Sequence, residues 1–307
     1  MAFEVTLHRM IIFFLILAVG FIAGRTGVIK KDYLPHLAQV ITKILLPVLI
    51  FYGTITSATV QNIVENWVFI AFAIVFYVVV ALILFALAKL MRLKGDRDKV
   101  FTFCFLFGNT GFVGIPLLVA LFPEGGMLYM MLFSIVDQIV FWTFGIWLAT
   151  ARDRETKFTP KSFLTPNIVA MVLALVFVVL QVPLPQVITD TLSTISSATS
   201  AMCMMYLGAM VCFSKWMQVV KCPELYVGII VKMIVLPIIG GHIMILLGLP
   251  QDTMVAMVAI MALPVMTVVP MIATMHGNEG EYATGITVVT LVVSVVTIPL
   301  TQLLAFL

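Results

Sequence analysis

The sequence predicts an all-α membrane protein of ten transmembrane helices, in two inverted five-helix repeats with broken helices 4 and 9. Three observations predict this fold. The 307 residues are 63% hydrophobic and only 10% charged, with a mean hydropathy of +1.20, whereas soluble domains are about 45–50% apolar and about 25% charged. Long apolar runs recur along the chain, and basic residues alternate between successive loops.

The apolar runs set the number of expected spans. A transmembrane helix needs about 20 mostly apolar residues. Ten runs reach or approach this length, and the sixth is the shortest. They are residues 3–24, 34–56, 66–90, 100–122, 127–150, 167–182, 187–213, 225–247, 253–275 and 283–307.

The loop charges predict an orientation. Lys and Arg lie after the odd-numbered spans, at Arg25, Lys30, Lys31, Arg92, Lys94, Arg97, Lys99, Arg152, Arg154, Lys157, Lys161, Lys215 and Lys221. The loops after spans 2, 4, 6 and 8 contain neither residue type. Because cytoplasmic loops carry the excess of Lys and Arg, both termini are expected outside the cytoplasm. The loop at 277–280 departs from the pattern, since it carries Glu279 and no basic residue.

The chain also divides into two similar halves, residues 1–151 and 167–307, joined by a predicted cytoplasmic linker at 152–166. Matching positions lie 155 residues apart, at Gly53 and Gly208, Asn109 and Pro264, and Glu124 and Glu279. Five spans are an odd number, so the second half would cross the membrane in the opposite sense, as in many secondary transporters. A chance alignment of two apolar regions is the alternative.

Spans 4 and 9 contain residues that interrupt a helix. Glycine weakens a helix, and proline removes a backbone donor and clashes with the preceding turn. Irregular backbone at membrane depth is tolerated where it is buried in protein or lines a wet cavity, and the half-helix ends attract ions. The expected substrate-binding residues are therefore Asn109, Thr110, Gly111, Gly114, Pro116, Pro264, Thr267 and Pro270. The alternative is a pair of kinks that serve packing alone.

Three ionisable residues stand out well inside the predicted spans, where such residues are usually functional. Asp137 is a candidate for taking up a coupling proton or sodium ion. Its alternative role is structural, with a lysine, Gln138 or nearby hydroxyls as partners. Lys43 and Lys232 are candidates for neutralising a carboxylate substrate, or their side chains extend toward the cytoplasmic interface.

The run Asn109-Thr110-Gly111-Phe112-Val113-Gly114-Ile115-Pro116-Leu117 resembles the fourth-helix motif of the auxin efflux carrier family. That family contains the plant PIN auxin carriers and bacterial malonate-type transporters. Residues 45–51, Leu236-Pro237 and residues 297–300 are similar to other motifs of the family. The resemblance implies two inverted five-helix repeats in which the broken helices 4 and 9 are crossed, with a mobile transport domain around them. It also implies a scaffold domain that forms a homodimer, and elevator-type alternating access. The long cytoplasmic loop of many plant members is missing, so the bacterial branch fits better.

The resulting expectation is a secondary carrier of a small organic anion in the plasma membrane. A malonate- or malate-like carboxylate is the first candidate and an auxin-like one the second, with H⁺ or Na⁺ as the coupling ion. A cation/proton antiporter, a sodium-coupled carrier of another solute and a channel are alternatives. An enzyme is not expected, because H-E-x-x-H is absent and no G-x-S-x-G lies in a span. No cofactor, metal or nucleic-acid partner is expected, and none of the four cysteines forms a C-x-x-C pair.

Overall fold

The computed structural model describes residues 2–57, 59–122, 126–153 and 165–306. In this part of the chain the regular elements are helices, apart from one isolated antiparallel bridge. Six of the described helices are long and apolar enough to cross a bilayer: Lys31–Thr56, Trp67–Leu90, Leu128–Ala149, Gln186–Phe213, Pro223–Leu246 and Gly280–Leu304. Shorter apolar helices cover Ile11–Arg25, Pro166–Leu180 and Gln251–Met261.

The helices of the first half follow the expected spans closely. They are α1 (Ala2–Arg25), η1 (Lys31–Tyr33), α2 (Leu34–Val40), η2 (Ile41–Leu45), α3 (Leu46–Ser57), α4 (Val60–Glu65), α5 (Trp67–Leu90), α6 (Arg97–Leu106), η3 (Thr110–Gly114), α7 (Ile115–Leu121), α8 (Gly126–Val140), η4 (Phe141–Gly145) and α9 (Ile146–Ala149). The segments η1 to α3 run on as one helix, as do α8 to α9.

The second half has a similar order of elements. They are α10 (Pro166–Leu180), α11 (Gln186–Phe213), η6 (Trp216–Lys221), α12 (Pro223–Gly228), η7 (Ile229–Val235), α13 (Leu236–Leu246), α14 (Gln251–Met261), α15 (Val269–Met275) and α16 (Gly280–Leu304). Thr165 caps α10 by accepting a hydrogen bond from the Ile168 N–H, 3.3 Å away. Most of the predicted linker, residues 154–164, lies outside the described residues.

Two wide helical turns precede prolines inside long helices. The π-helical segments η2 and η7 end just before Pro47 and Pro237, each the second residue of the helix that follows. A proline ring clashes with the carbonyl one turn earlier and offers no N–H, so a wider turn lets the helix continue. Lys43 and Lys232 both lie in these wide turns.

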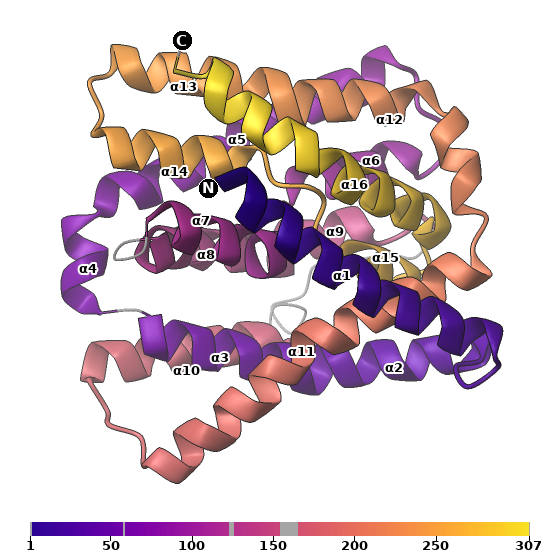
Figure 1. Ribbon diagram of the computed structural model, residues 1–307, viewed down its shortest axis with the longest axis horizontal. Helices are drawn as coiled ribbons and strands as arrows, with labels where there is room; N and C mark the ends of the chain where they lie inside the picture. Colours follow the sequence, from indigo (N-terminus) through magenta and orange to yellow (C-terminus); the bar gives the residue numbers. More distant parts are fainter. Residues whose placement is uncertain (1, 58, 123–125, 154–164, 307) are drawn as a thin grey trace.

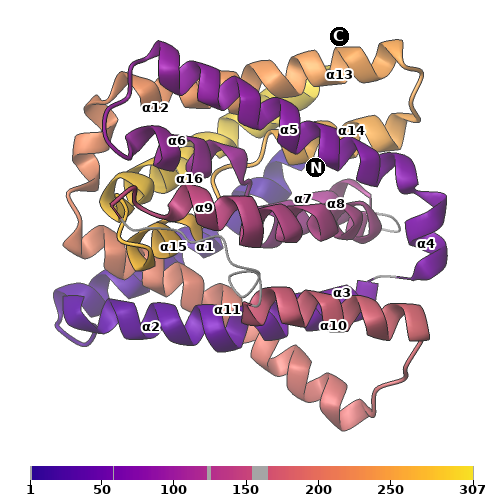
Figure 2. The same ribbon diagram turned by 180° about the vertical axis from the view of Figure 1, so that it is seen from behind.

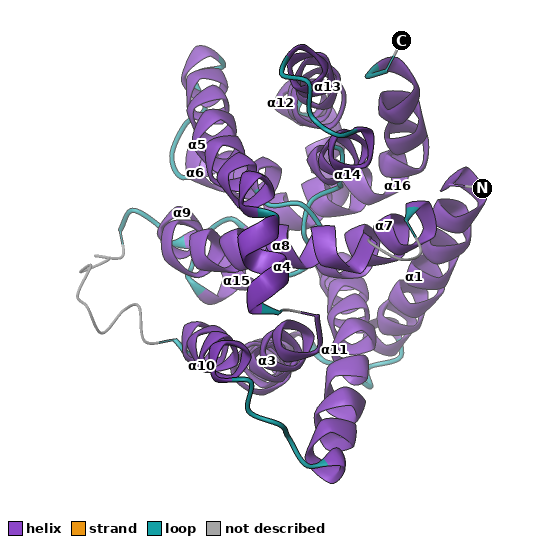
Figure 3. Ribbon diagram, turned by 90° about the vertical axis from the view of Figure 1, so that its left-hand side faces the viewer, coloured by secondary structure: helices purple, strands orange, loops and turns teal. Residues whose placement is uncertain are grey.

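The helices form two groups that face each other across the molecule. In Figure 1, α2, α3 and α10 form the lower layer, and α1 and α11 cross each other next to this layer. Contacts join α1 to α11 and α3 to both α10 and α11. Figure 2 shows α5, α6, α12, α13 and α14 on the opposite side, with α7, α8 and α9 between the layers. The end view in Figure 3 separates the α3–α10 pair from α7 and α8.

Glycines allow the close packing of α1 on α11. A Cβ atom added at Gly20 would overlap the Met205 carbonyl, and one at Gly208 would overlap the Leu17 carbonyl. Small residues let helix backbones approach one another in a membrane, where van der Waals packing drives association. The α1–α11 pair is therefore a closely packed part of the helix group that also contains α2, α3 and α10.

The acidic loop after α15 has an ionic partner. The Arg97 guanidinium lies 3.2 Å from Glu279 and 3.6 Å from Glu224, and Arg152 lies 2.6 Å from Asp98. Glu279 thus neutralises a basic residue that the sequence places on the cytoplasmic side. Its loop can belong to that side although it contains no Lys or Arg.

Candidate functional site

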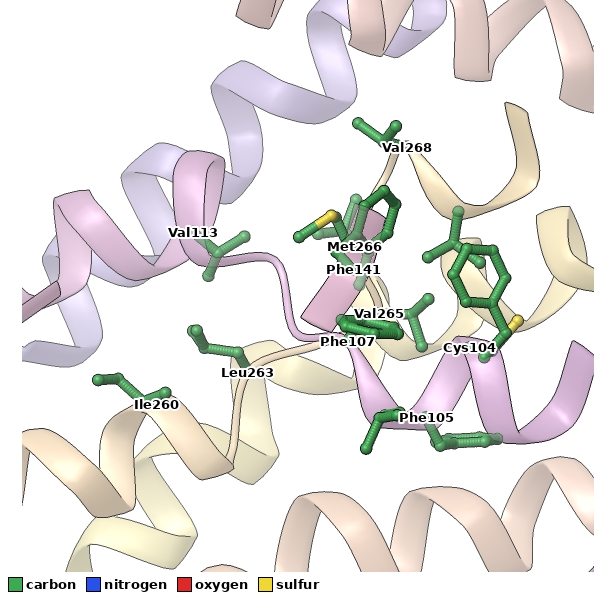
Figure 4. Close-up of a cluster of buried hydrophobic side chains, with 14 of the residues drawn as sticks. Cys104, Phe105, Phe107, Val113, Phe141, Ile260, Leu263, Val265, Met266 and Val268 are labelled. Carbon is green, nitrogen blue, oxygen red and sulfur yellow. The ribbon is translucent and has the colours of Figure 1, made fainter. Parts of the chain in front are cut away.

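Two helices are interrupted at the points where the sequence predicts breaks. Residues 107–109 separate α6 from η3, and residues 262–268 separate α14 from α15. The two irregular segments lie side by side (Figure 4), and we refer to them together as the crossing. Gly108 and Val265 form an antiparallel bridge there.

Backbone groups of the crossing satisfy one another. The bridge is held by the Asn109 N–H donating to the Pro264 carbonyl at 2.7 Å, and by the Met266 N–H donating to the Phe107 carbonyl at 3.0 Å. A backbone group left unsatisfied in a membrane interior costs several kcal/mol. Pairing the two breaks avoids that cost for both segments.

Side chains from two other helices complete the pairing. The Val265 N–H donates to the Thr290 hydroxyl of α16 at 3.2 Å. The Lys232 ammonium of η7 donates to the Leu263 carbonyl. The crossing is therefore held from α16 and from η7 as well as by its own bridge.

Residue size also matters at the crossing. A Cβ atom added at Gly108 would lie 3.1 Å from the Leu263 Cβ and 3.6 Å from the Lys232 ammonium nitrogen. One added at Gly114 would lie 3.0 Å from the Leu263 Cδ1. At Gly111 a Cβ atom would meet nothing within 4 Å. Gly108 and Gly114 thus permit close packing, whereas Gly111 faces open space.

Apolar side chains surround the paired breaks. Figure 4 shows Phe107 beside Val265 at the centre, with Phe141 and Met266 close together next to them. The rings of Phe107 and Phe141 meet edge to face with centroids 4.9 Å apart. This apolar surrounding strengthens the hydrogen bonds of the crossing, because it lowers the local dielectric.

A cavity of about 180 Å³ opens against the crossing. Its lining comes from both helix groups. The lining residues are Leu46, Leu49, Ile50, Gly53, Thr54, Asn109, Thr110, Gly111, Ile115, Met130, Met131, Ser134, Ile135, Gln138, Phe141, Trp142, Met171, Ser200, Met266 and Val268. They are mostly apolar, and this lining contains no Lys, Arg, Asp or Glu among the described residues. The cavity thus lies between α3, α10 and α11 on one side and the crossing with α8 on the other.

The predicted binding residues divide between the cavity and its surroundings. Asn109, Thr110 and Gly111 line the cavity. Gly114, Pro264, Thr267 and Pro270 are buried but are not among its lining residues. The side chain of Pro116 lies outside the described residues. The structure therefore brings the start of η3, and not the whole predicted set, to the cavity wall.

Lys43 and Lys232, the two lysines expected to contact substrate, differ sharply in their exposure. Lys43 is exposed on the outside of η2. Lys232 is 2% exposed and contacts the crossing. Neither lines the cavity.

Asp137 is buried close behind the cavity wall. Its carboxylate accepts a hydrogen bond from the Tyr77 hydroxyl of α5, and another from the Gln138 amide at 3.2 Å. Gln138 in turn accepts from the Trp142 indole N–H at 2.9 Å. Because Gln138 and Trp142 line the cavity, they connect Asp137 to it. Of the expected partners, Gln138 and a hydroxyl are present, and the hydroxyl comes from Tyr77.

The sequence reasoning missed several cavity residues. Ser134, Gln138 and Trp142 follow one another at intervals of four on α8 and η4, which places them on one helix face. That spacing was a usable signal. Ser200 and Thr54 gave none, because single hydroxyls are common in membrane helices.

Two comparisons with known proteins bear on the family of the chain. The family described as "Membrane transport protein" matches residues 5–159 and 151–301 of the chain. The chain is also similar to an uncharacterized transporter of Methanocaldococcus jannaschii, at 24% identity over 209 residues. That match covers 64% of this chain and 66% of the relative, just under two thirds of its length.

The two matched segments each cover about half of the chain, which suggests an internal repeat. Together they extend over nearly all of it. The chain therefore belongs to the membrane transport protein family, that of the auxin efflux carriers, and is a multi-pass membrane protein of a family of transporters rather than of enzymes.

Proposed function

We propose that this transporter is a secondary carrier of a small organic anion, which binds in the cavity beside the crossing. One observation carries the proposal: the start of η3 forms part of the cavity wall, through Asn109, Thr110 and Gly111. The N–H groups of Asn109 and Thr110 already donate to the Pro264 and Gly108 carbonyls. The attraction for an anion at this end therefore comes from the helix dipole, which is positive there. An anion is the ligand that such an end attracts, and no acidic side chain among the described lining residues opposes it.

The first substrate candidates are malonate- or malate-like carboxylates, as the family resemblance implies. A second candidate is an auxin-like carboxylate with an apolar ring. The lining favours this second class, because Ile50, Met131, Phe141 and Trp142 present apolar surface without a cationic side chain. Both classes contain a carboxylate that would bind at the N-terminal end of η3, and they differ in the rest of the substrate molecule.

The transport cycle proposed is elevator-type alternating access. The scaffold would comprise α1, α3, α10 and α11, and the mobile domain would comprise α5 to α9 and α12 to α16. The position of the cavity between these groups supports such a cycle, since a sliding mobile domain would carry the cavity with it. Ten spans in two inverted repeats, a homodimer formed through the scaffold, and termini outside the cytoplasm belong to the same proposal.

Asp137 is the proposed site of coupling to H⁺ or Na⁺. Its connection to the cavity through Gln138 and Trp142 supports this role. A cation/proton antiporter is less well supported, because the cavity wall is apolar and carries no acidic side chain in the part described.

Thermal unfolding of the purified chain in the presence of carboxylates, with and without sodium, tests substrate binding. A ligand of the folded state raises the apparent stability. We expect at least one small carboxylate to raise the Tm of the native chain but not of the Asn109→Ala variant. No shift with any malonate-like or ring-bearing carboxylate would count against the proposal.

A further inference from the structure

Lys232 is a buried lysine that lies against the crossing. Only 2% of its surface is exposed, although lysine is almost never fully buried unless it is paired. None of the three salt bridges found among the described residues involves it. Its partner is instead the backbone of the crossing.

The ammonium group lies at the end of a half-helix. It donates a hydrogen bond to the carbonyl of Leu263, two residues beyond the last residue of α14. A Cβ atom placed on Gly108 would lie 3.6 Å from the same nitrogen, so the ammonium also lies against the other broken segment. The last carbonyls of a helix lack intrahelical partners, and the dipole there is negative.

This position is one that attracts a metal cation in carriers with interrupted helices. Unwound carbonyls and half-helix C-terminal ends commonly coordinate the coupling Na⁺ or H⁺ there. In this chain the Lys232 nitrogen already contacts that end of α14. The lysine reaches it from η7 and does not line the cavity. A positive charge is thus supplied by the chain itself.

We propose that the Lys232 ammonium takes the place of a bound sodium ion at the crossing, as a cation tethered to the chain. It neutralises the C-terminal end of α14 and holds the crossing together throughout the transport cycle. This inference rests on the proposed function only in assuming that the crossing belongs to a transport site. It requires that the native crossing binds no sodium.

Thermal unfolding of the full chain in detergent tests the proposal, with sodium chloride, methylammonium chloride and choline chloride compared at equal ionic strength. The variant is Lys232→Ala. Lys43→Ala is the matched control, because Lys43 lies in the other π-helical turn before a proline but is exposed. In choline we expect the Tm of Lys232→Ala to fall by at least about 5 °C, and that of Lys43→Ala to stay near the native value.

Sodium or methylammonium should raise the Tm of Lys232→Ala, because a small cation enters the vacated position. Sodium should raise the Tm of Lys232→Ala more than that of the native chain, whose own response to sodium reports binding at Asp137 alone. If Lys232→Ala does not fold, Lys232→Gln replaces it, since it lacks the charge and leaves room for a cation.

Two results would overturn the proposal. One is a native chain that sodium stabilises as much as the variant. The other is an uncharged variant that neither cation stabilises. Because unfolding is measured without substrate, these outcomes do not depend on whether the chain carries an organic anion.

Discussion

Single residues around the cavity have separable roles. Asp137 is buried and held by Tyr77 and Gln138, so its charge is close to the cavity without forming its wall. Gly111 forms part of the wall and has open space where a side chain would be. Under the proposed function, the first position serves ion coupling and the second serves substrate contact. Substitutions at the two positions should therefore fail in different ways.

The Asp137→Asn variant should lose coupling and keep exchange. Asparagine fills the same space but does not take up a proton or offer a full negative charge to sodium. In proteoliposomes we expect uptake driven by a proton or sodium gradient to fall close to background, while counterflow of substrate persists. Asp190→Asn, at an exposed position of α11, serves as the control and should leave both activities intact. Gradient-driven uptake that survives in Asp137→Asn would remove Asp137 from the coupling site.

Filling the cavity at Gly111 should block transport without unfolding the chain. The Gly111→Val side chain would extend into free space, so we expect little change in Tm. Substrate affinity should fall at least about tenfold, equivalent to about 1.4 kcal/mol. Val119→Leu adds a methylene to a partly exposed position on α7 outside the cavity and is the control. Ligand titration followed by thermal shift measures both quantities, and unchanged affinity in Gly111→Val would place the substrate elsewhere.

At the scale of elements, the two broken helices form one structural unit. The bridge between Gly108 and Val265 pairs their backbones, and Thr290 and Lys232 hold them from neighbouring helices. A span that is broken in isolation would leave polar groups in lipid. Two breaks that meet satisfy each other, so each half of the chain needs the other at this point.

The contact from α16 can be tested by Thr290→Val, which keeps the shape of the side chain. The Val265 N–H would then be buried without its acceptor, at a cost of about 1–3 kcal/mol. Thr301→Val is the matched control. Thr301 is also fully buried on α16, but its hydroxyl donates only to the Ile298 carbonyl of its own helix. We expect Thr290→Val to lower the Tm clearly more than Thr301→Val, and equal shifts would show that the α16 contact contributes little.

Parts of this unit could be predicted from sequence and others could not. The breaks near Asn109 and Pro264 follow from glycine and proline, whose effects on a helix are local. Lys43 and Lys232 look alike in sequence, each in an apolar run shortly before a leucine and a proline. Only the neighbouring helices decide that one is exposed and the other contacts the crossing. Tyr77 was missed as a partner of Asp137 for the same reason, since 60 residues separate them.

At the scale of the whole molecule, the cavity lies between two helix groups. The group with α1, α3, α10 and α11 supplies Ile50, Met171 and Ser200, and the other supplies the crossing and α8. A substrate bound there touches both groups. In the proposed cycle, relative movement of the groups exposes the cavity to alternate sides of the membrane.

Cysteine labelling tests that topology. In a chain whose four native cysteines are replaced by alanine, Lys94→Cys should react with a membrane-impermeant maleimide only from the cytoplasmic side. Gln251→Cys, at the exposed start of α14, should react only from the outside. These sides follow from the distribution of Lys and Arg. Labelling of both positions from the same side would refute the inverted arrangement.

Uptake into proteoliposomes is the most direct test of the central claim, that a small organic anion passes through the cavity at the crossing. Radiolabelled malonate, malate and a ring-bearing carboxylate would be offered to the native chain and to the Asn109→Ala and Pro264→Ala variants. We predict saturable uptake of at least one of these anions by the native chain. Uptake should be strongly reduced in both variants when equal amounts of folded protein are inserted. Absence of uptake for all three anions, together with variants that behave like the native chain, would contradict the claim.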